Sequence, residues 1–207
     1  MKNLSLFFAT LRNRFKVDDV PFQFHEPGVL VDGDLRLRLH GTLPGDARRG
    51  IVPEYIFDMV RADSLDGPDG SARPDRPGRP GGPGVLDRED LLDRPDKPDR
   101  PATAMGRLSL RIGNTEHIEK YAGHIGYSVD PPYRGHRLAA RSCLLILPLA
   151  RAHGINPLWI TCNPENAASR RTCEIIGSTL VETVPIPPSD PLYRWDTKWK
   201  CRYRVDL

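Results

Sequence analysis

One segment in the middle of the chain has a composition that cannot form a packed core. At about residues 63–103 it consists mostly of Asp, Arg, Pro and Gly, as in Arg73-Pro74-Asp75-Arg76-Pro77-Gly78-Arg79-Pro80. Its few apolar side chains cannot offset the entropy cost of ordering roughly 40 residues. We therefore expect a disordered insertion, which we interpret as a tolerated surface loop. A tether or a docking site for a partner is the alternative interpretation.

The rest of the 207-residue chain suits one domain. We place this domain at residues 33–207, interrupted by the insertion, and regard residues 1–32 as an N-terminal extension. The formal net charge is only +3, so acidic and basic residues nearly balance. Because a nucleic-acid-binding protein normally needs a clear basic excess for its phosphate contacts, we do not expect a nucleic acid as partner.

The cysteines and the apolar stretches predict the compartment. No CxxC pair and no Cys/His set with zinc spacing occurs, so we expect no metal site and four free thiols: Cys143, Cys162, Cys173 and Cys201. No stretch approaches the roughly 20 apolar residues of a membrane span. Residues 4–11 faintly resemble a signal peptide, but basic residues follow where a cleavage site would stand. We predict a cytoplasmic protein without a membrane partner, and a homodimer is left open.

Hydrophobic periodicity predicts strands first and then an alternation of helices and strands. Strands are expected at 35–43, 55–60, 108–112 and 123–129, followed by a helix at 138–153, a strand at 158–162, a helix at 166–176, and strands at 179–184 and 201–205. The insertion would then join two neighbouring strands of a hairpin. Pro148 falls inside the first helix and should kink it or force a local adjustment. This order predicts an α/β fold with a mixed, mostly antiparallel sheet.

The most informative stretch is a strand, a glycine-containing loop and a long helix in direct succession, at residues 124–153. The backbone N–H groups at a helix start lack partners, and the helix dipole adds partial positive charge. Together they form a site for a pyrophosphate, to which Arg134 and Arg137 would add charge. A plain connection with solvated arginines is the alternative.

The loop sequence Arg134-Gly135-His136-Arg137-Leu138-Ala139 resembles motif A of the GNAT superfamily of N-acetyltransferases, usually written Gln/Arg-x-x-Gly-x-Gly/Ala. Arg134 and Ala139 fit the first and last positions. Arg137 stands where the pattern has glycine, which lets the backbone approach the pyrophosphate closely. Arginine there would either replace backbone contacts with side-chain contacts or narrow the site.

A second block, at residues 160–177, resembles motif B of the same superfamily. Asn166, Ser169 and Gly177 fit its spacing without gaps. The two motifs occur in the right order, separated by a helix and a strand of suitable length. The resemblance covers about residues 33–62 and 105–207. Over these residues the chain is similar to a bacterial group of predicted acetyltransferases with unassigned substrates.

This resemblance implies a fold in which the fourth and fifth strands splay apart, with acetyl-CoA as co-substrate in the gap. The backbone at Ser128 and Val129 would pair with the pantetheine arm, and Asn166 and Ser169 would contact the cofactor from the other side. A mere helix cap is the alternative for the last two. The pyrophosphate would lie on the motif A residues, Arg134, Gly135, His136, Arg137, Leu138 and Ala139.

The resemblance also implies acetyl transfer to a primary amine, of a small molecule or of a protein N-terminus. For the base we predict His124, with Glu119 as second choice, although a structural role for His124 is equally open. Family members often have a tyrosine as the acid where this chain has Cys173. A packing role for Cys173 is the alternative, with Tyr127 and Tyr193 as substitutes for the acid.

Two other classes of function stay open at this point. One is a non-catalytic acyl-CoA-binding or regulatory module of the same fold, favoured by Arg137 and Cys173. The other is an interaction protein in which the insertion is the working part. The acceptor is expected to contact residues 41–53 and 185–200, which have an irregular sequence of mixed charge.

Overall fold

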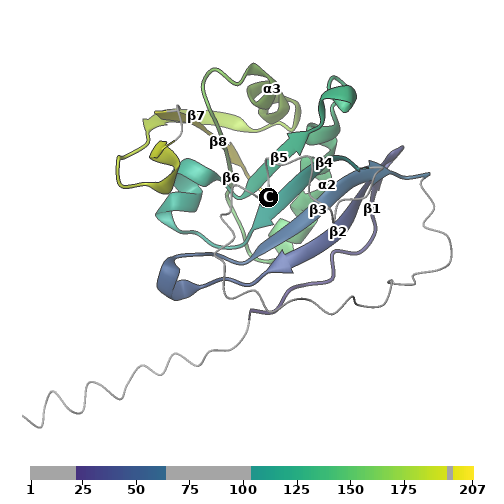
Figure 1. Cartoon of the computed structure of the whole chain (residues 1–207), viewed down its shortest axis with the longest axis horizontal. Helices are drawn as coiled ribbons and strands as arrows, with labels where there is room; N and C mark the ends of the chain where they lie inside the picture. The colour runs from purple at the N-terminus through teal and green to yellow at the C-terminus, as the bar shows by residue number, and fades with distance from the viewer. Residues whose placement is uncertain (1–21, 64–103, 195–197) are drawn as a thin grey trace, which may run out of the picture.

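The computed structural model describes residues 22–63, 104–194 and 198–207 (Figure 1). Almost all of the insertion predicted at 63–103, and most of the predicted N-terminal extension, lie outside these described residues. None of the helices in the described ranges is long and apolar enough to cross a membrane.

The described part of the chain contains eight strands in two sheets. The first sheet is antiparallel and follows the chain order: β1 (Leu30–Asp32), β2 (Leu35–Leu43), β3 (Glu54–Arg61), β4 (Ala104–Arg111) and β5 (Ile125–Val129). The second sheet has the order β6-β8-β7 and contains β6 (Leu158–Cys162), β7 (Thr179–Pro185) and β8 (Trp199–Val205). The predicted mixed, mostly antiparallel α/β fold is confirmed. The strands β3 and β4 that flank the insertion are paired neighbours, as predicted.

The helices are few. Within the described residues the α-helices are α2 (Leu138–Ala152) and α3 (Ala167–Ile175), and the short helices are η1 (Ala47–Arg49), η2 (Ile118–Ala122, a π-helix), η3 (Pro131–Tyr133) and η4 (Pro191–Arg194). The helix α2 is continuous through Pro148. Pro148 and Leu144, four residues earlier, are both exposed, so water can bond the Leu144 carbonyl that the missing proline N–H leaves.

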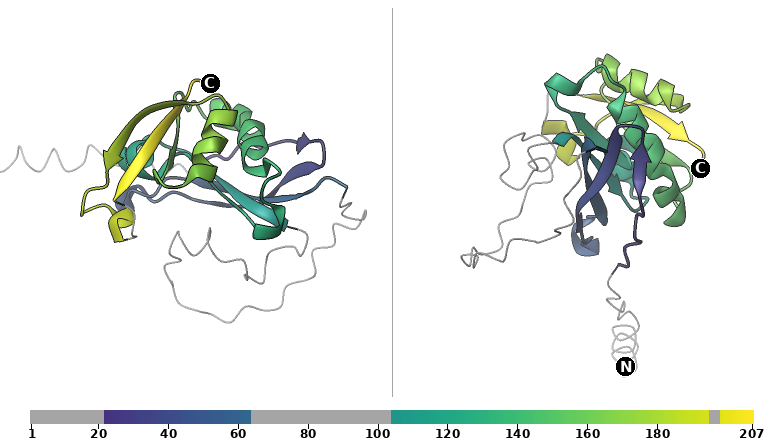
Figure 2. Two further views of the ribbon diagram at one scale, coloured as in Figure 1. Left: turned by 90° about the horizontal axis from the view of Figure 1, so that it is seen from above. Right: turned by 90° about the vertical axis from the view of Figure 1, so that its right-hand side faces the viewer.

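The first sheet has one apolar and one polar face. The alternation in β2 buries Leu35 and Leu37, as its sequence predicts. The apolar face carries Tyr55, Phe57, Leu108 and Leu110 and shares one core with the buried side of α2. Both α2 and α3 lie on this side of the sheet (Figure 2, left). The strand β1, inside the stretch regarded as extension, pairs with β2 and so belongs to the sheet.

The polar face of the same sheet is buried as well. Arg111 pairs with Glu54 at 3.2 Å, and Arg107 pairs with Asp58 at 3.3 Å, with all four side chains at most 7% exposed. Each buried charge has an opposite partner, which a buried charge requires. The face therefore has a fixed charge pattern from β3 to β4, directly beside β5.

The two sheets meet at one point and then separate. The His124 N–H donates to the Trp159 carbonyl at 2.7 Å, which joins the start of β5 to β6. Beyond this junction β5 is paired only with β4, and β6 only with β8, within the described part of the chain. The splay expected between the fourth and fifth predicted strands is thus confirmed, between β5 and β6.

Candidate active site

The loop of motif A ends in the first turn of α2, at the wide end of the gap between β5 and β6. Residues 134–137 are exposed, and the loop makes its turn with positive φ angles at Gly135 (+87°) and Arg137 (+57°). The first main-chain bond of the helix is from Arg141 N–H to the Arg137 carbonyl, at 3.0 Å. The preceding N–H groups have no intrahelical partner and point out of the helix end, where an anion can bind them.

Arg137 keeps the backbone conformation that glycine would adopt. It is the helix N-cap, with φ +57° and ψ +21°, and among the described residues it is the only non-glycine residue with a positive φ. A side chain in this left-handed region costs about 1 kcal/mol. Arg137 therefore has a backbone conformation in which glycine is favoured, and its side chain is exposed.

The guanidinium of Arg134 folds back onto the end of β5. Its Nε donates to the Val129 carbonyl at 3.0 Å. The Asp130 N–H points the other way, to the Met105 carbonyl next to β4. Because main-chain groups of successive strand residues point in alternate directions, those of Val129 and Tyr127 face the gap, and those of Ser128 face β4. The Arg134 guanidinium is thus bonded to the Val129 carbonyl, which lies at the edge of the gap.

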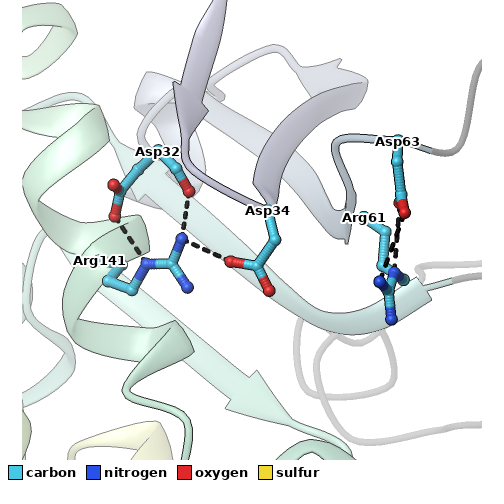
Figure 3. A network of polar contacts seen from close by, with 5 residues as sticks. All are labelled: Asp32, Asp34, Arg61, Asp63 and Arg141. Carbon is cyan, nitrogen blue, oxygen red and sulfur yellow. Dashed lines mark hydrogen bonds and ion pairs between the residues drawn. The ribbon is translucent and has the colours of Figure 1, made fainter.

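A salt-bridge cluster fixes the first turn of α2 to the first sheet (Figure 3). Arg141 donates from Nε to Asp32 at 2.6 Å and pairs through Nη2 with Asp34 at 2.9 Å. The hydrogen bond from Arg141 is the main cause that lowers the pKa of Asp34. Both aspartates flank the tight turn at Gly33, so the β1–β2 hairpin positions the start of α2. Sequence reasoning missed this contact, which joins residues 109 apart.

The motif B residues begin α3 on the other side of the gap. Asn166 caps the helix, and its Oδ1 accepts from the Ser169 N–H at 2.9 Å. The Ser169 hydroxyl lies 2.7 Å from the hydroxyl of Tyr127 on β5. The cap role foreseen as an alternative for Asn166 is therefore present, while Ser169 connects the two sides of the gap. Burial raises the pKa of Tyr127.

The four cysteines are free, as predicted, and all four are buried. Cys173 and Cys162 face each other beneath Ser169. The hydrogen bond that Cys173 donates to Cys162 raises the pKa of Cys173 and lowers that of Cys162. Cys173 is fully buried in the shared core. These surroundings make its thiol a poor proton donor, and its predicted role as acid stays a prediction.

The two predicted bases lie in different surroundings. His124 is fully buried: Nδ1 accepts from the Trp159 N–H at 2.9 Å, and Nε2 lies 3.0 Å from Asn114 Oδ1. Burial lowers its pKa to about 4. Both ring nitrogens are thus engaged, which favours the structural alternative. Glu119, on η2, is half-buried, and its carboxylate makes no hydrogen bond within the described part of the chain.

Comparison with known proteins agrees with this arrangement. A family model described as an acetyltransferase (GNAT) domain matches residues 92–179, which contain the gap, the loop and both helices. Over this stretch, which is less than half of its length, the chain is similar to a GNAT acetyltransferase domain. A search of curated proteins finds no match.

Several solved structures are similar to this chain. A probable acetyltransferase from Chromobacterium violaceum shares 13% identity at a TM-score of 0.50, over 93% of this chain and 92% of that one, which supports the fold. The microcin C7 self-immunity acetyltransferase MccE, in complex with acetyl-CoA and AMP, shares 18% identity at a TM-score of 0.39, over 51% of this chain and 56% of that one. The putative acetyltransferase YncA from Salmonella typhimurium, with acetyl-CoA, shares 17% identity at a TM-score of 0.40, over 51% and 60%. The chain thus spans less than two thirds of the latter two proteins.

Proposed function

We propose that this chain binds acetyl-CoA in the gap between β5 and β6 and transfers the acetyl group to a primary amine. The acceptor would be a small molecule or a protein N-terminus. The observation that carries the proposal is the separation of the two strands beyond the junction of His124 and Trp159. It leaves main-chain groups of β5 free to pair with an extended ligand, beside a helix start that can hold its phosphates.

The cofactor would lie along three surfaces. The pyrophosphate binds the N–H groups at the start of α2, with charge from Arg134 and Arg137. The pantetheine arm pairs with the edge of β5 at Val129, whose carbonyl Arg134 releases when the phosphates attract the guanidinium. Ser128 supports this edge through its pairing with Arg107 on β4. On the opposite side of the gap, Asn166 and Ser169 lie at the start of α3, where they would contact the cofactor.

The chemistry follows from this placement. The amine nitrogen attacks the thioester carbon and loses a proton to a base, so that a C–N bond forms and the C–S bond breaks with release of the CoA thiolate. The oxyanion of the intermediate needs an N–H donor in a water-poor site. The N–H of Tyr127 faces the gap and suits this role. The thiolate takes its proton from Cys173, from the Tyr127 hydroxyl or from solvent.

Calorimetry and a thiol-release assay with purified full-length protein test the proposal. Acetyl-CoA at about 100 times its Kd should stabilise the fold by about 2.7 kcal/mol. Thiol release should then depend on the amine across a panel of amino acids, polyamines and short peptides. Binding without turnover would favour a non-catalytic acyl-CoA-binding module. Absence of binding would refute both functions and favour an interaction protein.

A further inference from the structure

A histidine and an aspartate that are far apart in the sequence form a close pair beside η2. His117 Nδ1 lies 2.7 Å from Asp190 Oδ2, across a sequence separation of 73 residues. His117 is the N-cap of η2, and Asp190 directly precedes η4. The His117 side chain is 29% exposed, whereas that of Asp190 is only 6% exposed. The ring is thus reachable from outside, and its partner is not.

The surrounding backbone fixes the aspartate. Its Oδ1 accepts from the Leu192 N–H at 2.9 Å, and its own N–H donates to the Pro187 carbonyl at 2.9 Å. The Asp190 carbonyl accepts from the Tyr193 N–H at 3.0 Å. A carboxylate can only accept, so the Nδ1 of His117 carries the ring proton. The lone pair is then on Nε2, which makes no hydrogen bond within the described part of the chain.

The pair lies on the face of the second sheet that is opposite to α3. On β6, Ile160 and Cys162 point into the core shared with α3. Thr161 points the other way and donates to the Tyr121 carbonyl of η2 at 2.7 Å. Arg202 of β8 is on this same face and donates to the Glu119 carbonyl at 2.9 Å. The helix η2 therefore covers the face of β6 that carries Thr161, which is the face away from α3 and from the proposed cofactor site.

The same helix also borders the polar face of the first sheet. Arg111 of β4 donates to the carbonyls of Ala122 and Gly123 at the end of η2, at 3.2 and 3.1 Å. Its guanidinium lies next to Gly126 of β5, where an added Cβ would be 3.2 Å from Nη2. The segment that carries His117 thus connects both sheets on the side of the gap opposite to α2 and α3.

We propose that His117 is the general base of acetyl transfer and that Asp190 is its positioning residue. The inference rests on the proposed function. Nε2 takes the proton that the amine nitrogen loses as it forms the C–N bond, and the C–S electron pair leaves with the CoA sulfur. The departing thiolate takes a proton in turn, so the charge balances. Asp190 holds the ring in the tautomer with a free Nε2 and stabilises the imidazolium that forms.

This assignment has an advantage over the two bases that the sequence indicated. The lone pair of His124 already accepts from the Trp159 N–H. Glu119 has a free carboxylate but no orienting partner among the described residues. His117 combines a free nitrogen with a buried orienting carboxylate, the arrangement expected of an activated base.

Steady-state kinetics of matched variants test the pair. His117→Gln and Asp190→Asn should each lower kcat by on the order of 10²–10⁴-fold, since Asn can donate to Nδ1 and force the proton onto Nε2. The acetyl-CoA Kd should stay within threefold of wild type. Imidazole added to His117→Ala should restore part of the rate. His40→Gln, at a second His–Asp pair (3.1 Å from Asp58), should leave kcat within threefold.

Turnover is measured with the best amine of the panel. Where no amine reacts, the slow hydrolysis of acetyl-CoA is measured instead, because water is activated by the same base. A His117→Gln variant with a kcat near wild type overturns the proposal, as does loss of activity in Glu119→Gln alone. Failure of the wild-type chain to bind acetyl-CoA refutes the proposed function instead, so the two failures are distinguishable.

Discussion

The hydroxyl of Tyr127 lies 2.7 Å from Oγ of Ser169, so a side chain of β5 touches the first turn of α3 across the gap between the two sheets. Ser169 also receives the cap bond of Asn166. The contact therefore couples β5 to the helix that carries motif B. The Cys173 thiol is fully buried, whereas Tyr127 is half-buried. The Tyr127 hydroxyl is therefore the more accessible proton donor of the two.

Replacement of Tyr127 by Phe tests whether this hydroxyl acts as the acid. Loss of one hydrogen bond should cost about 1 kcal/mol of unfolding free energy. If the hydroxyl protonates the thiolate, kcat should fall by about 10²-fold, the lower end for acid catalysis. Ser169→Ala is the control, since it removes the partner and keeps the phenol. Equal kcat losses in both variants would indicate a purely structural contact.

Replacement of Arg134 by Ala tests the phosphate cradle. The charged hydrogen bonds to the pyrophosphate should be lost, which weakens acetyl-CoA binding by roughly 1.5–3 kcal/mol. Calorimetry measures the change in Kd. Arg151→Ala is the matched control, because this exposed arginine lies in the last turn of the same helix, far from the cradle. An unchanged Kd in Arg134→Ala would count against the cradle.

Substitution at Arg137 separates backbone strain from charge. Arg137→Gly relieves a left-handed side-chain conformation that costs about 1 kcal/mol, although the more flexible unfolded chain offsets part of this gain. Arg137→Ala removes the charge and keeps the strain. The melting temperature of the Gly variant should be higher than that of the Ala variant. Acetyl-CoA should also bind the Gly variant more tightly than the Ala variant. A more stable Ala variant would contradict the strain argument.

Local signals explain what the sequence predicted well. The alternation in β2 and the paired strands around the insertion depend on neighbouring residues, and both are confirmed. Gly177 ends the second helical region as predicted, with a φ of +76°. The motif spacing was sufficient to locate the loop and the gap, because helix starts and strand ends follow from local patterns.

Contacts between distant segments explain what the sequence could not predict. His124 was a reasonable base from its residue type, but its two partners, Asn114 and the Trp159 backbone, follow only from the fold. His117 was one of several polar residues in its hairpin until the fold placed Asp190 beside it. No periodicity connects residues 73 positions apart. The short strand β1 was missed because three residues carry too little pattern.

The pH dependence of stability tests the structural role of His124. Burial lowers its pKa from 6.5 to about 4 in the folded state, so the unfolded chain binds the proton more readily. The stabilising contribution is therefore complete above about pH 6.5 and is lost as the pH falls toward 4. At about 1.36 kcal/mol per pKa unit, the loss is on the order of 3 kcal/mol.

Urea unfolding of the wild type and of His124→Gln between pH 7 and pH 4 measures this contribution. Carboxylates titrate in both proteins, so the difference between the two curves isolates the histidine. The wild type should lose its advantage over the variant as the pH falls, because the imidazole must then either charge in the core or leave it. Parallel curves would mean that His124 keeps an ordinary affinity for protons. In that case its ring would have better access to solvent than its contacts with Asn114 and Trp159 indicate, and a role as base would be favoured again.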